Sequence, residues 1–302
     1  MLTIKQMILA HKFRSGFARG DKKRDAGQTT PADVERFDDI LYGSEKCKKY
    51  QMLDVYRPKN VQGKLPVIIS VHGGAWVYGS KEVYQFYTMQ LARHGFAVVN
   101  YSYRLAPEYL FPGMLEDTQK VFEWVSDPAN AEKYGFDLNN VFAVGDSAGG
   151  HLLSLYASAM TNPEYAKNYP FFKKTLELRG VALNCGKYNL GAHIETDYQM
   201  RLVARNILPK KGSPDELELV NGLAYLTKDF PPAYVMSCIG DFLLGDSVAM
   251  DKAMTEKGIP HEYHCYGTEE KPLWHVFHCD MRLEEAAICN DAECEFFRKL
   301  IK

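Results

Sequence analysis

The segment "FAVGDSAGGHLLSL", residues 142–155, joins an apolar run to a helix-like pattern and places one serine between small residues. Its G-x-S-x-G pattern (145–149) follows a predicted buried strand and opens a helix predicted at 148–160. A serine on such a strand-to-helix turn is held in an unfavourable backbone conformation, and the glycines let strand and helix approach closely. The short pattern alone also fits a packing turn, whereas this context favours Ser147 as a nucleophile.

Short apolar runs alternate with helix-like stretches along most of the chain. The runs are nearly continuous, as is typical of strands covered on both faces: PVIISV (66–71), FAVVNYSY (96–103), VFAVGD (141–146), RGVALNC (179–185) and PAYVMSCIGD (232–241). Helices are predicted between and after them, at 114–125, 148–160, 247–257 and 282–300. This alternation predicts the α/β class, with a mostly parallel central sheet flanked by helices. An alternating stretch at 50–58 predicts a further strand near a sheet edge.

Two segments interrupt this rhythm within what we interpret as one domain, residues 1–302. The first 45 residues are polar and are expected to precede the sheet. Residues 188–230 separate two predicted strands by more than a plain crossover needs. We interpret both, residues 1–45 and 188–230, as cap segments.

Composition restricts the class of protein and its partners. The 302 residues are 46% hydrophobic and 25% charged, with a formal net charge of −2, so no overall field favours nucleic acid or an anionic membrane. The start "MLTIKQMILAHKF" lacks a signal-peptide core, and no apolar run approaches membrane-spanning length. The seven cysteines are odd in number and without paired spacing, which favours a reducing compartment. We therefore expect a cytoplasmic location.

Function in an open parallel sheet collects at the carboxyl ends of the strands. The stretch "VHGGAW" (71–76) follows the first buried strand and contains two adjacent glycines. A glycine-rich loop there is expected to offer backbone N–H groups to an oxyanion. The expected donors are the amides of Gly73, Gly74 and Ala148, and His72 is expected to orient the loop.

A nucleophilic serine needs a base, and the base needs a carboxylate that fixes its tautomer. The chain order expected after the serine is acid first and histidine last. Asp241 follows its strand directly and is the predicted acid, whereas Asp246 is better suited to capping the helix that begins near 247. His275 lies in a loop past the last strand and is the predicted base, whereas His278 is expected to begin the final helix.

Three stretches, "HGGAW" (72–76), "YRLAPE" (103–108) and "GDSAGG" (145–150), resemble the hormone-sensitive-lipase-like family of α/β-hydrolases, the group of microbial carboxylesterases. The resemblance runs from about residue 39 to the C-terminus. It implies the α/β-hydrolase fold, with an N-terminal segment in the cap. It also implies that Arg104 and Glu108 support the floor of the active site.

These observations predict a serine carboxylic-ester hydrolase that acts on short acyl esters through an acyl-enzyme, without cofactor or metal. The expected partner is a small-molecule ester, with no nucleic acid and no membrane. Two alternatives remain open, a serine peptidase of the same fold and a catalytically silent ligand-binding protein. The oligomeric state also stays open, a homodimer being one option.

Metal binding is a further alternative. The stretches "HEYHC" (261–265) and "HVFHC" (275–279) share the form H-x-x-H-C and offer nitrogen and sulfur ligands for zinc. His261 and His264 lie in a predicted strand, however, and residues three apart in a strand point to opposite faces. This spacing argues against a zinc site built from the first stretch.

Overall fold

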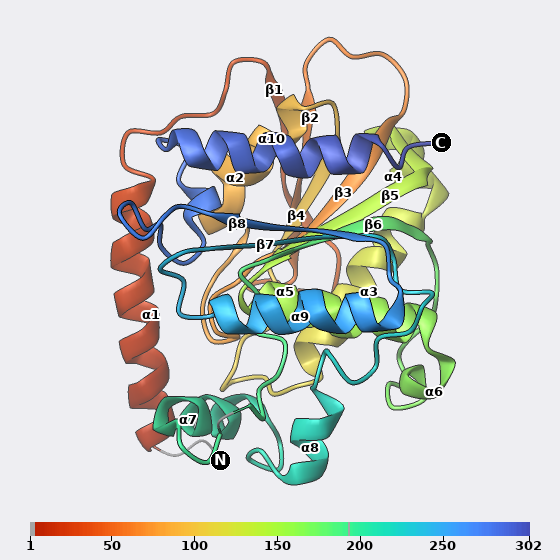
Figure 1. The fold of residues 1–302 in the computed structure, drawn as a ribbon. Coiled ribbons are helices and arrows are strands. Elements are labelled where there is room, and N and C mark those ends of the chain that lie inside the picture. The colour runs from red at the N-terminus through yellow and green to blue at the C-terminus, as the bar shows by residue number, and fades with distance from the viewer. Residues whose placement is uncertain (1–3, 193) are drawn as a thin grey trace.

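One eight-stranded sheet runs through the computed structural model, which describes residues 4–192 and 194–302 (Figure 1). Residues 1–3 and 193, which fall within the expected cap segments, lie outside the described residues. The spatial order is β1-β2-β4-β3-β5-β6-β7-β8. The strands are β1 (Val34–Leu41), β2 (Met52–Pro58), β3 (Leu65–Val71), β4 (Ala97–Tyr101), β5 (Phe136–Asp146), β6 (Leu178–Asn184), β7 (Ala233–Cys238) and β8 (His261–Tyr266).

The pairs β1–β2 and β2–β4 are antiparallel, and all the other neighbours are parallel. The predicted α/β class with a mostly parallel sheet is therefore confirmed. Residues of one strand alternate between the two faces. Val67 and Ile69 of β3 join the hydrophobic core under one face, and Ile68 joins the core under the other.

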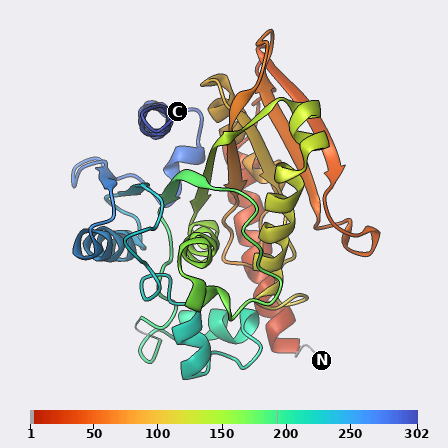
Figure 2. The ribbon, with the colours of Figure 1, turned by 90° about the vertical axis from the view of Figure 1, so that its right-hand side faces the viewer.

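Helices cover both faces of the sheet. Helices α2 (Lys81–Arg93) and α10 (Glu284–Arg298) lie on one face, and α3 (Gly113–Ser126), α5 (Ala148–Thr161) and α9 (Leu244–Lys257) lie on the other. Figure 2 looks along α10 and α5, with the sheet between them. The remaining α-helices are α1 (Ile4–Arg24), α4 (Pro128–Tyr134), α6 (Pro163–Ala166), α7 (Tyr198–Ile207) and α8 (Pro214–Leu219).

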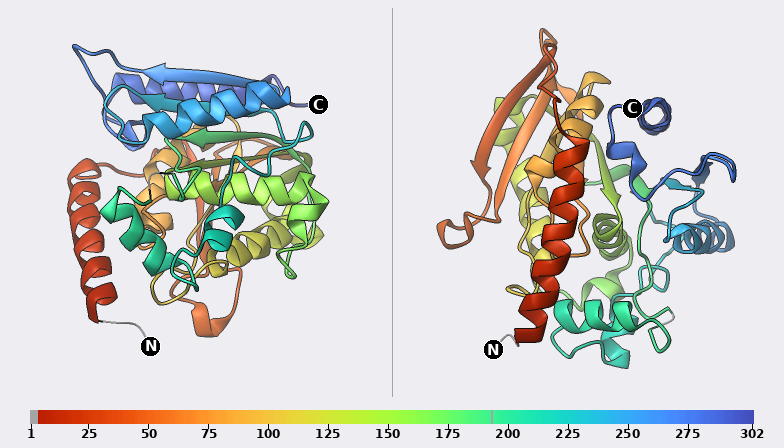
Figure 3. Two further views of the ribbon diagram at one scale, coloured as in Figure 1. Left: turned by 60° about the horizontal axis from the view of Figure 1, so that its bottom comes forward. Right: turned by 90° about the vertical axis from the view of Figure 1, so that its left-hand side faces the viewer.

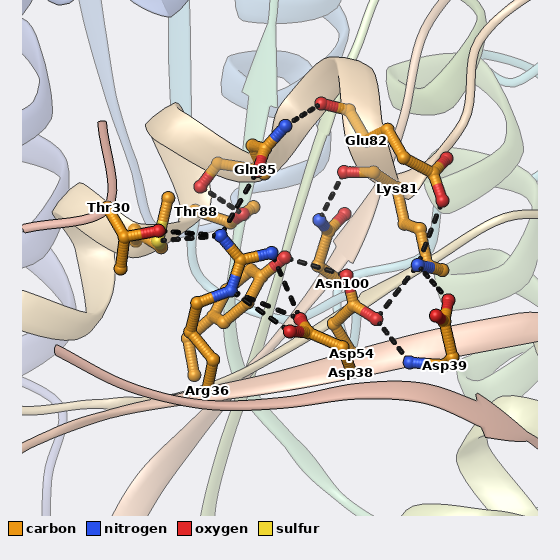
Figure 4. A network of polar contacts seen from close by, with 12 residues as sticks. Thr30, Arg36, Asp38, Asp39, Asp54, Lys81, Glu82, Gln85, Thr88 and Asn100 are labelled. Atoms are coloured by element: carbon orange, nitrogen blue, oxygen red, sulfur yellow. Dashed lines mark hydrogen bonds and ion pairs between the residues drawn. The ribbon is translucent and has the colours of Figure 1, made fainter. Parts of the chain in front are cut away.

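The sheet begins earlier in the chain than expected. Residues 34–41 form the edge strand β1, so the expectation that the first 45 residues precede the sheet is wrong for this part. Polar side chains hold β1 in place, because its only fully buried residue is Val34. Arg36 hydrogen-bonds Asp38 on the same strand and Gln85 of α2 (Figure 4).

A buried lysine ties β1, β2 and α2 together. The ammonium of Lys81 lies 2.8 Å from Asp39, 2.9 Å from Asp54 and 2.9 Å from Glu82 (Figure 4). The side chain of Asn100 donates to the carbonyl of Lys81 at 2.7 Å. A buried charge is stable only when it is paired in this way. The pairing therefore replaces the apolar burial that an edge strand usually needs.

Helix α1 lies across the edge of the molecule where the loops after β3 and β4 emerge (Figure 3). The guanidinium of Arg14 donates to the carbonyls of Val77, at 2.7 Å, and Ala106, at 2.9 Å, and to Glu108 at 2.8 Å. The ring of Phe17 packs on Tyr78 with centroids 5.7 Å apart. Helix α1 therefore contacts both the loop after β3 and the loop after β4.

The segment 188–230 contains α7 and α8, which lie at the same end of the molecule as the first turns of α1 (Figures 1 and 3). Helix α7 buries Val203, Ala204 and Ile207 in the hydrophobic core on the face of the sheet that α3, α5 and α9 cover. Among the described residues, no helix combines the length and apolar character needed to span a bilayer.

Candidate active site

The turn between β5 and α5 holds Ser147 in a strained conformation, with φ 52° and ψ −117°. Its N–H donates to the carbonyl of Asn184 at 3.0 Å. The flanking glycines are required by space: a Cβ on Gly149 would lie 2.0 Å from the carbonyl oxygen of Val71, and one on Gly145 would lie 2.6 Å from that of Gly149. Backbone strain of this kind is common at functional sites, and on such a strand-to-helix turn it makes the serine side chain project from the end of the strand.

The structure brings Ser147, His275 and Asp241 together from the ends of three different strands. The Nε2 of His275 lies 3.0 Å from the Oγ of Ser147, and its Nδ1 lies 2.8 Å from Oδ1 of Asp241. A neutral imidazole that donates from Nδ1 to the carboxylate leaves Nε2 free to accept the serine hydroxyl proton. The arrangement is that of a nucleophile, a base and a carboxylate that orients the base.

The carboxylate of Asp241 is buried, with 6% of the residue exposed. Besides His275 it accepts the N–H of Leu243 at 2.8 Å and the hydroxyl of Ser237 at 3.0 Å. Burial opposes the charge, but the hydrogen bond and charge of His275 and the Leu243 N–H outweigh it and lower the pKa of Asp241 below its usual value. The lowered pKa favours the charged carboxylate beside the imidazole of His275.

Asp246 and His278, the alternative candidates for the acid and the base, have other surroundings. Helix α9 begins at Leu244, so Asp246 lies inside its first turn and pairs with the ammonium of Lys187 at 3.0 Å, and the expected capping role is wrong. His278 lies in the short 3₁₀ helix η2 (Phe277–Cys279), before α10 begins, so the expectation that it starts the final helix is also wrong. Complete burial lowers the pKa of His278 to about 3.

The loop after β3 differs from the expectation at Gly73. The Gly73 N–H donates to the hydroxyl of Tyr84 at 2.9 Å, and that hydroxyl donates to Oδ2 of Asp146 at 2.6 Å. The Gly73 amide is therefore occupied, and its assignment as an oxyanion donor is corrected. Within residues 4–192 and 194–302, the N–H groups of Gly74 and Ala75 make no hydrogen bond to protein atoms.

Ala148 is the first residue of α5, where helix N–H groups have no partner within the helix. Among the described residues, the amides of Gly74, Ala75 and Ala148 are therefore free donors in the loop after β3 and at the start of α5. Ala75 was missed from the sequence because no glycine marks it. Its φ of 52° shows that the loop stays strained one residue beyond Gly74.

His72 holds the loop after β3 in place. Its ring stacks on Tyr103 with centroids 4.0 Å apart, and its Nδ1 lies 2.7 Å from the Gly73 carbonyl. The hydroxyl of Tyr103 donates to the carbonyl of His72 at 2.8 Å. Burial lowers the pKa of His72 to about 4, so the ring is neutral and has a packing position rather than a reacting one.

Arg104 and Glu108 have separate partners. Arg104 donates to Asp117 and Glu116 of α3, with Nε 2.9 Å from Oδ2 of Asp117 and Nη2 2.8 Å from Oε2 of Glu116. Glu108 pairs with Arg14 of α1. The first residue anchors the loop after β4 to α3, and the second anchors α1 over that loop.

A buried carboxyl behind the serine turn was not predicted. Glu293 of α10, with 0% exposed, accepts the side-chain N–H of Asn184 at 2.6 Å and the hydroxyl of Tyr87 at 2.8 Å. Burial raises the pKa of Glu293 to about 7. Because Asn184 also receives the Ser147 N–H through its carbonyl, α10 supports the serine turn indirectly. An acidic residue on a helix gives no signal of such a contact in the sequence.

Two groups of metal-ligating side chains exist among the described residues. One is Asp146, His278 and Cys279, and the other is Cys185, Asp241 and His275. Neither reproduces an H-x-x-H-C stretch. His261 lies 3.0 Å from Asp251, and His264 lies 3.1 Å from Glu262.

The sequence matches the family model described as BD-FAE over residues 53–257. It is 29% identical to versiconal hemiacetal acetate esterase of Dothistroma septosporum over 78% of this chain and 74% of that protein. It is 36% identical to esterase LipC of Mycobacterium tuberculosis, over 43% of this chain but only 32% of that protein.

The structure is similar to that of esterase B from Lactobacillus rhamnosis inhibited by a tributyrin phosphonate. The two share 25% sequence identity and a TM-score of 0.90 over 99% of this chain and 96% of that chain. The similarity therefore extends over nearly the whole fold, α1 included.

Proposed function

Because this chain belongs to the BD-FAE family and has the α/β-hydrolase fold of the hormone-sensitive-lipase-like esterases, we propose that Ser147, His275 and Asp241 perform its chemistry. It is a serine carboxylic-ester hydrolase. The observation that carries the residue assignment is the continuous contact from the serine Oγ through the imidazole to the carboxylate, at 3.0 and 2.8 Å.

The reaction begins with His275. Its Nε2 takes the hydroxyl proton of Ser147 while Oγ attacks the ester carbonyl carbon, and Asp241 stabilises the imidazolium that forms. The imidazolium then gives the proton to the departing alcohol, which leaves an acyl group on Ser147. A water molecule repeats both steps on the acyl-enzyme and releases the acid.

The negative oxygen of each tetrahedral intermediate needs donors that are already in place. We assign the N–H groups of Gly74, Ala75 and Ala148, because Gly73 is bound to Tyr84. Loss of one such donor typically costs about 3–4 kcal/mol of transition-state stabilisation.

The substrates we propose are small esters with short acyl groups. Apolar side chains beside the base offer a surface for them: Phe242 is 77% exposed with its ring 4.5 Å from that of His275, and Trp274 is 50% exposed. The acetate in the name of one relative and the tributyrin phosphonate bound by esterase B support an acyl range from acetyl to butyryl. Helix α1 and residues 188–230 are proposed to cap this surface within a single domain.

We also propose a cytoplasmic location and no nucleic-acid or membrane partner. The near-neutral net charge of −2 supports the second part, and the odd number of cysteines, seven, supports the first.

The test compares Ser147→Ala with the wild type on p-nitrophenyl acetate, butyrate and octanoate and on a peptide amide. We expect Ser147→Ala to fold and to lose turnover by a factor on the order of 10⁴ or more. The wild type should prefer acetate and butyrate and leave the amide intact.

Ser158→Ala is the matched control, since Ser158 lies on the same helix and its buried hydroxyl has no hydrogen-bond partner among the described residues. It should keep wild-type turnover. Turnover retained in Ser147→Ala contradicts the assignment, and cleavage of the amide at a comparable rate favours a peptidase.

A further inference from the structure

A thiol lies beside the proposed acid and base. Cys185 follows the last residue of β6 and is fully buried. Its sulfur, a carboxylate oxygen of Asp241 and a ring nitrogen of His275 all lie within 4.8 Å of one another. No step of the proposed ester hydrolysis uses this thiol.

Thiolate, imidazole and carboxylate are together the ligands that Zn²⁺ prefers in proteins. Zinc binds sulfur at about 2.3 Å and nitrogen or oxygen at about 2.0–2.2 Å, so the ligand atoms of a tetrahedral site lie roughly 3.3–3.8 Å apart. The His275 nitrogen and the Asp241 oxygen, 2.8 Å apart, must therefore separate by about 0.5 Å to hold the ion. The Cys185 sulfur lies within 4.8 Å of both and must take up the same spacing. Three protein ligands leave a fourth position for water.

We propose that Cys185, Asp241 and His275 form an inhibitory zinc site. The proposal rests on the proposed function, because its effect is exerted on the catalytic base. The nitrogen of His275 that faces Asp241 is Nδ1, 2.8 Å from the carboxylate. Zinc bound there takes the place of the Nδ1 proton.

The consequence for catalysis follows from the tautomer. A neutral imidazole bound to metal through Nδ1 carries its proton on Nε2, so Nε2 can no longer accept the proton of Ser147. On binding, the Cys185 thiol loses its proton to solvent, and the histidine proton moves from Nδ1 to Nε2. No electron is transferred, and removal of the ion restores the original state.

The proposal concerns the first group of ligating side chains. Of the two groups, it is the one that contains the proposed acid and base, whereas the second consists of Asp146, His278 and Cys279.

The first experiment measures hydrolysis of p-nitrophenyl acetate against increasing Zn²⁺. We expect inhibition of the wild type that excess EDTA reverses. Cys185→Ser should hydrolyse the ester like the wild type without metal, but require at least about tenfold more zinc for half-inhibition, since even supporting partners of a metal site contribute 10–100-fold. Cys265→Ser, which removes an exposed cysteine on β8, is the control and should match the wild type.

Zinc inhibition of Cys185→Ser at the wild-type concentration, or a wild type insensitive to zinc, overturns the proposal. If Cys185→Ser fails to fold by circular dichroism, Cys185→Ala takes its place in the same comparison.

A second measurement does not depend on activity. Co²⁺ added to Ser147→Ala should produce the near-ultraviolet sulfur-to-cobalt charge-transfer band, and the added substitution Cys185→Ser should abolish it. Absence of the band in Ser147→Ala refutes the metal site. The band in a wild type that hydrolyses no ester would refute the proposed function and leave the metal site standing.

Discussion

Tyr84 connects the loop after β3 to Asp146, the residue before the proposed nucleophile. Its hydroxyl accepts the Gly73 N–H and donates to Asp146, whose pKa burial raises to about 6. Tyr84→Phe leaves both groups unpaired in a buried place, which costs about 1–3 kcal/mol of stability. We expect kcat to fall with little change in KM, because the adjacent free amides lose their support.

Tyr56→Phe is the control for this prediction. Tyr56 is also fully buried, and its hydroxyl donates to Asp54 at 2.7 Å, far from the serine along the sheet. Thermal unfolding should show a loss of stability in both variants, and steady-state kinetics a fall of kcat in Tyr84→Phe alone. Equal kcat values in the two variants would refute the positioning role.

The choice of acid is tested by Asp241→Asn and Asp246→Asn. The amide at 241 no longer stabilises the imidazolium or fixes its tautomer, so kcat should fall by on the order of 10⁴. Asp246→Asn breaks the ion pair with Lys187 and should leave kcat near the wild-type value. An equal fall in the second variant would mean that the wrong carboxylate has been assigned.

Single residues differ in how far the sequence predicts them. The predictions of Ser147, Asp241 and His275 follow from a motif, from positions after strands and from the order of the three residues along the chain, all of which can be read directly from the sequence. The position of Gly73 depends on Tyr84, which approaches from another helix. A local sequence pattern does not reveal such a contact. The sequence alone therefore could not show that the Gly73 amide is occupied while the Gly74 amide is free.

Elements were predictable where burial was two-sided. The central strands are almost continuous apolar runs because helices cover both faces, and β3 to β7 were found for that reason. Strand β1 and helix α1 were missed because polar contacts hold them: Arg36 and Asp39 on β1, and Arg14 on α1. Few of their apolar residues are buried: Val34 on β1 and, among the described side chains of α1, Ala10, whereas Ile8 is 62% exposed.

Arg14 is expected to control how α1 sits on the loops after β3 and β4. Arg14→Ala removes two bonds to backbone carbonyls and the pair with Glu108. The half-exposed ion pair itself contributes little, about 1 kcal/mol or less, so the carbonyl bonds dominate. Hydrogen exchange followed by mass spectrometry should accelerate in residues 4–24 and 72–79.

Arg19→Ala, an exposed position on the same helix, should exchange like the wild type. Unchanged exchange in Arg14→Ala would show that other contacts hold the helix.

A buried polar layer joins α10 to the serine turn and gives the whole molecule a pH dependence. Glu293 has a pKa near 4.5 when unfolded and about 7 in the folded protein because of burial. Between these values the folded state binds more protons, so this carboxyl's contribution to stability decreases as the pH rises from 4.5 to 7. The change is on the order of 3 kcal/mol.

Other buried groups titrate in the same range. Asp146, raised to about 6, acts in the same direction, and His278, lowered to about 3, acts in the opposite one. Comparing the wild type with Glu293→Gln cancels both. Denaturant unfolding from pH 5 to 7.5 should show the wild type losing stability relative to the variant, whereas parallel curves would contradict the assigned shift.

The order of these residues along the chain has a consequence during synthesis. A nascent polypeptide on the ribosome can form the β5–α5 turn early, but the imidazole at 275 and the carboxyl at 293 that hold it arrive more than a hundred residues later. The ability to hydrolyse esters must therefore appear late in translation. A chain released before residue 293 lacks the carboxyl that binds Asn184 behind the serine turn.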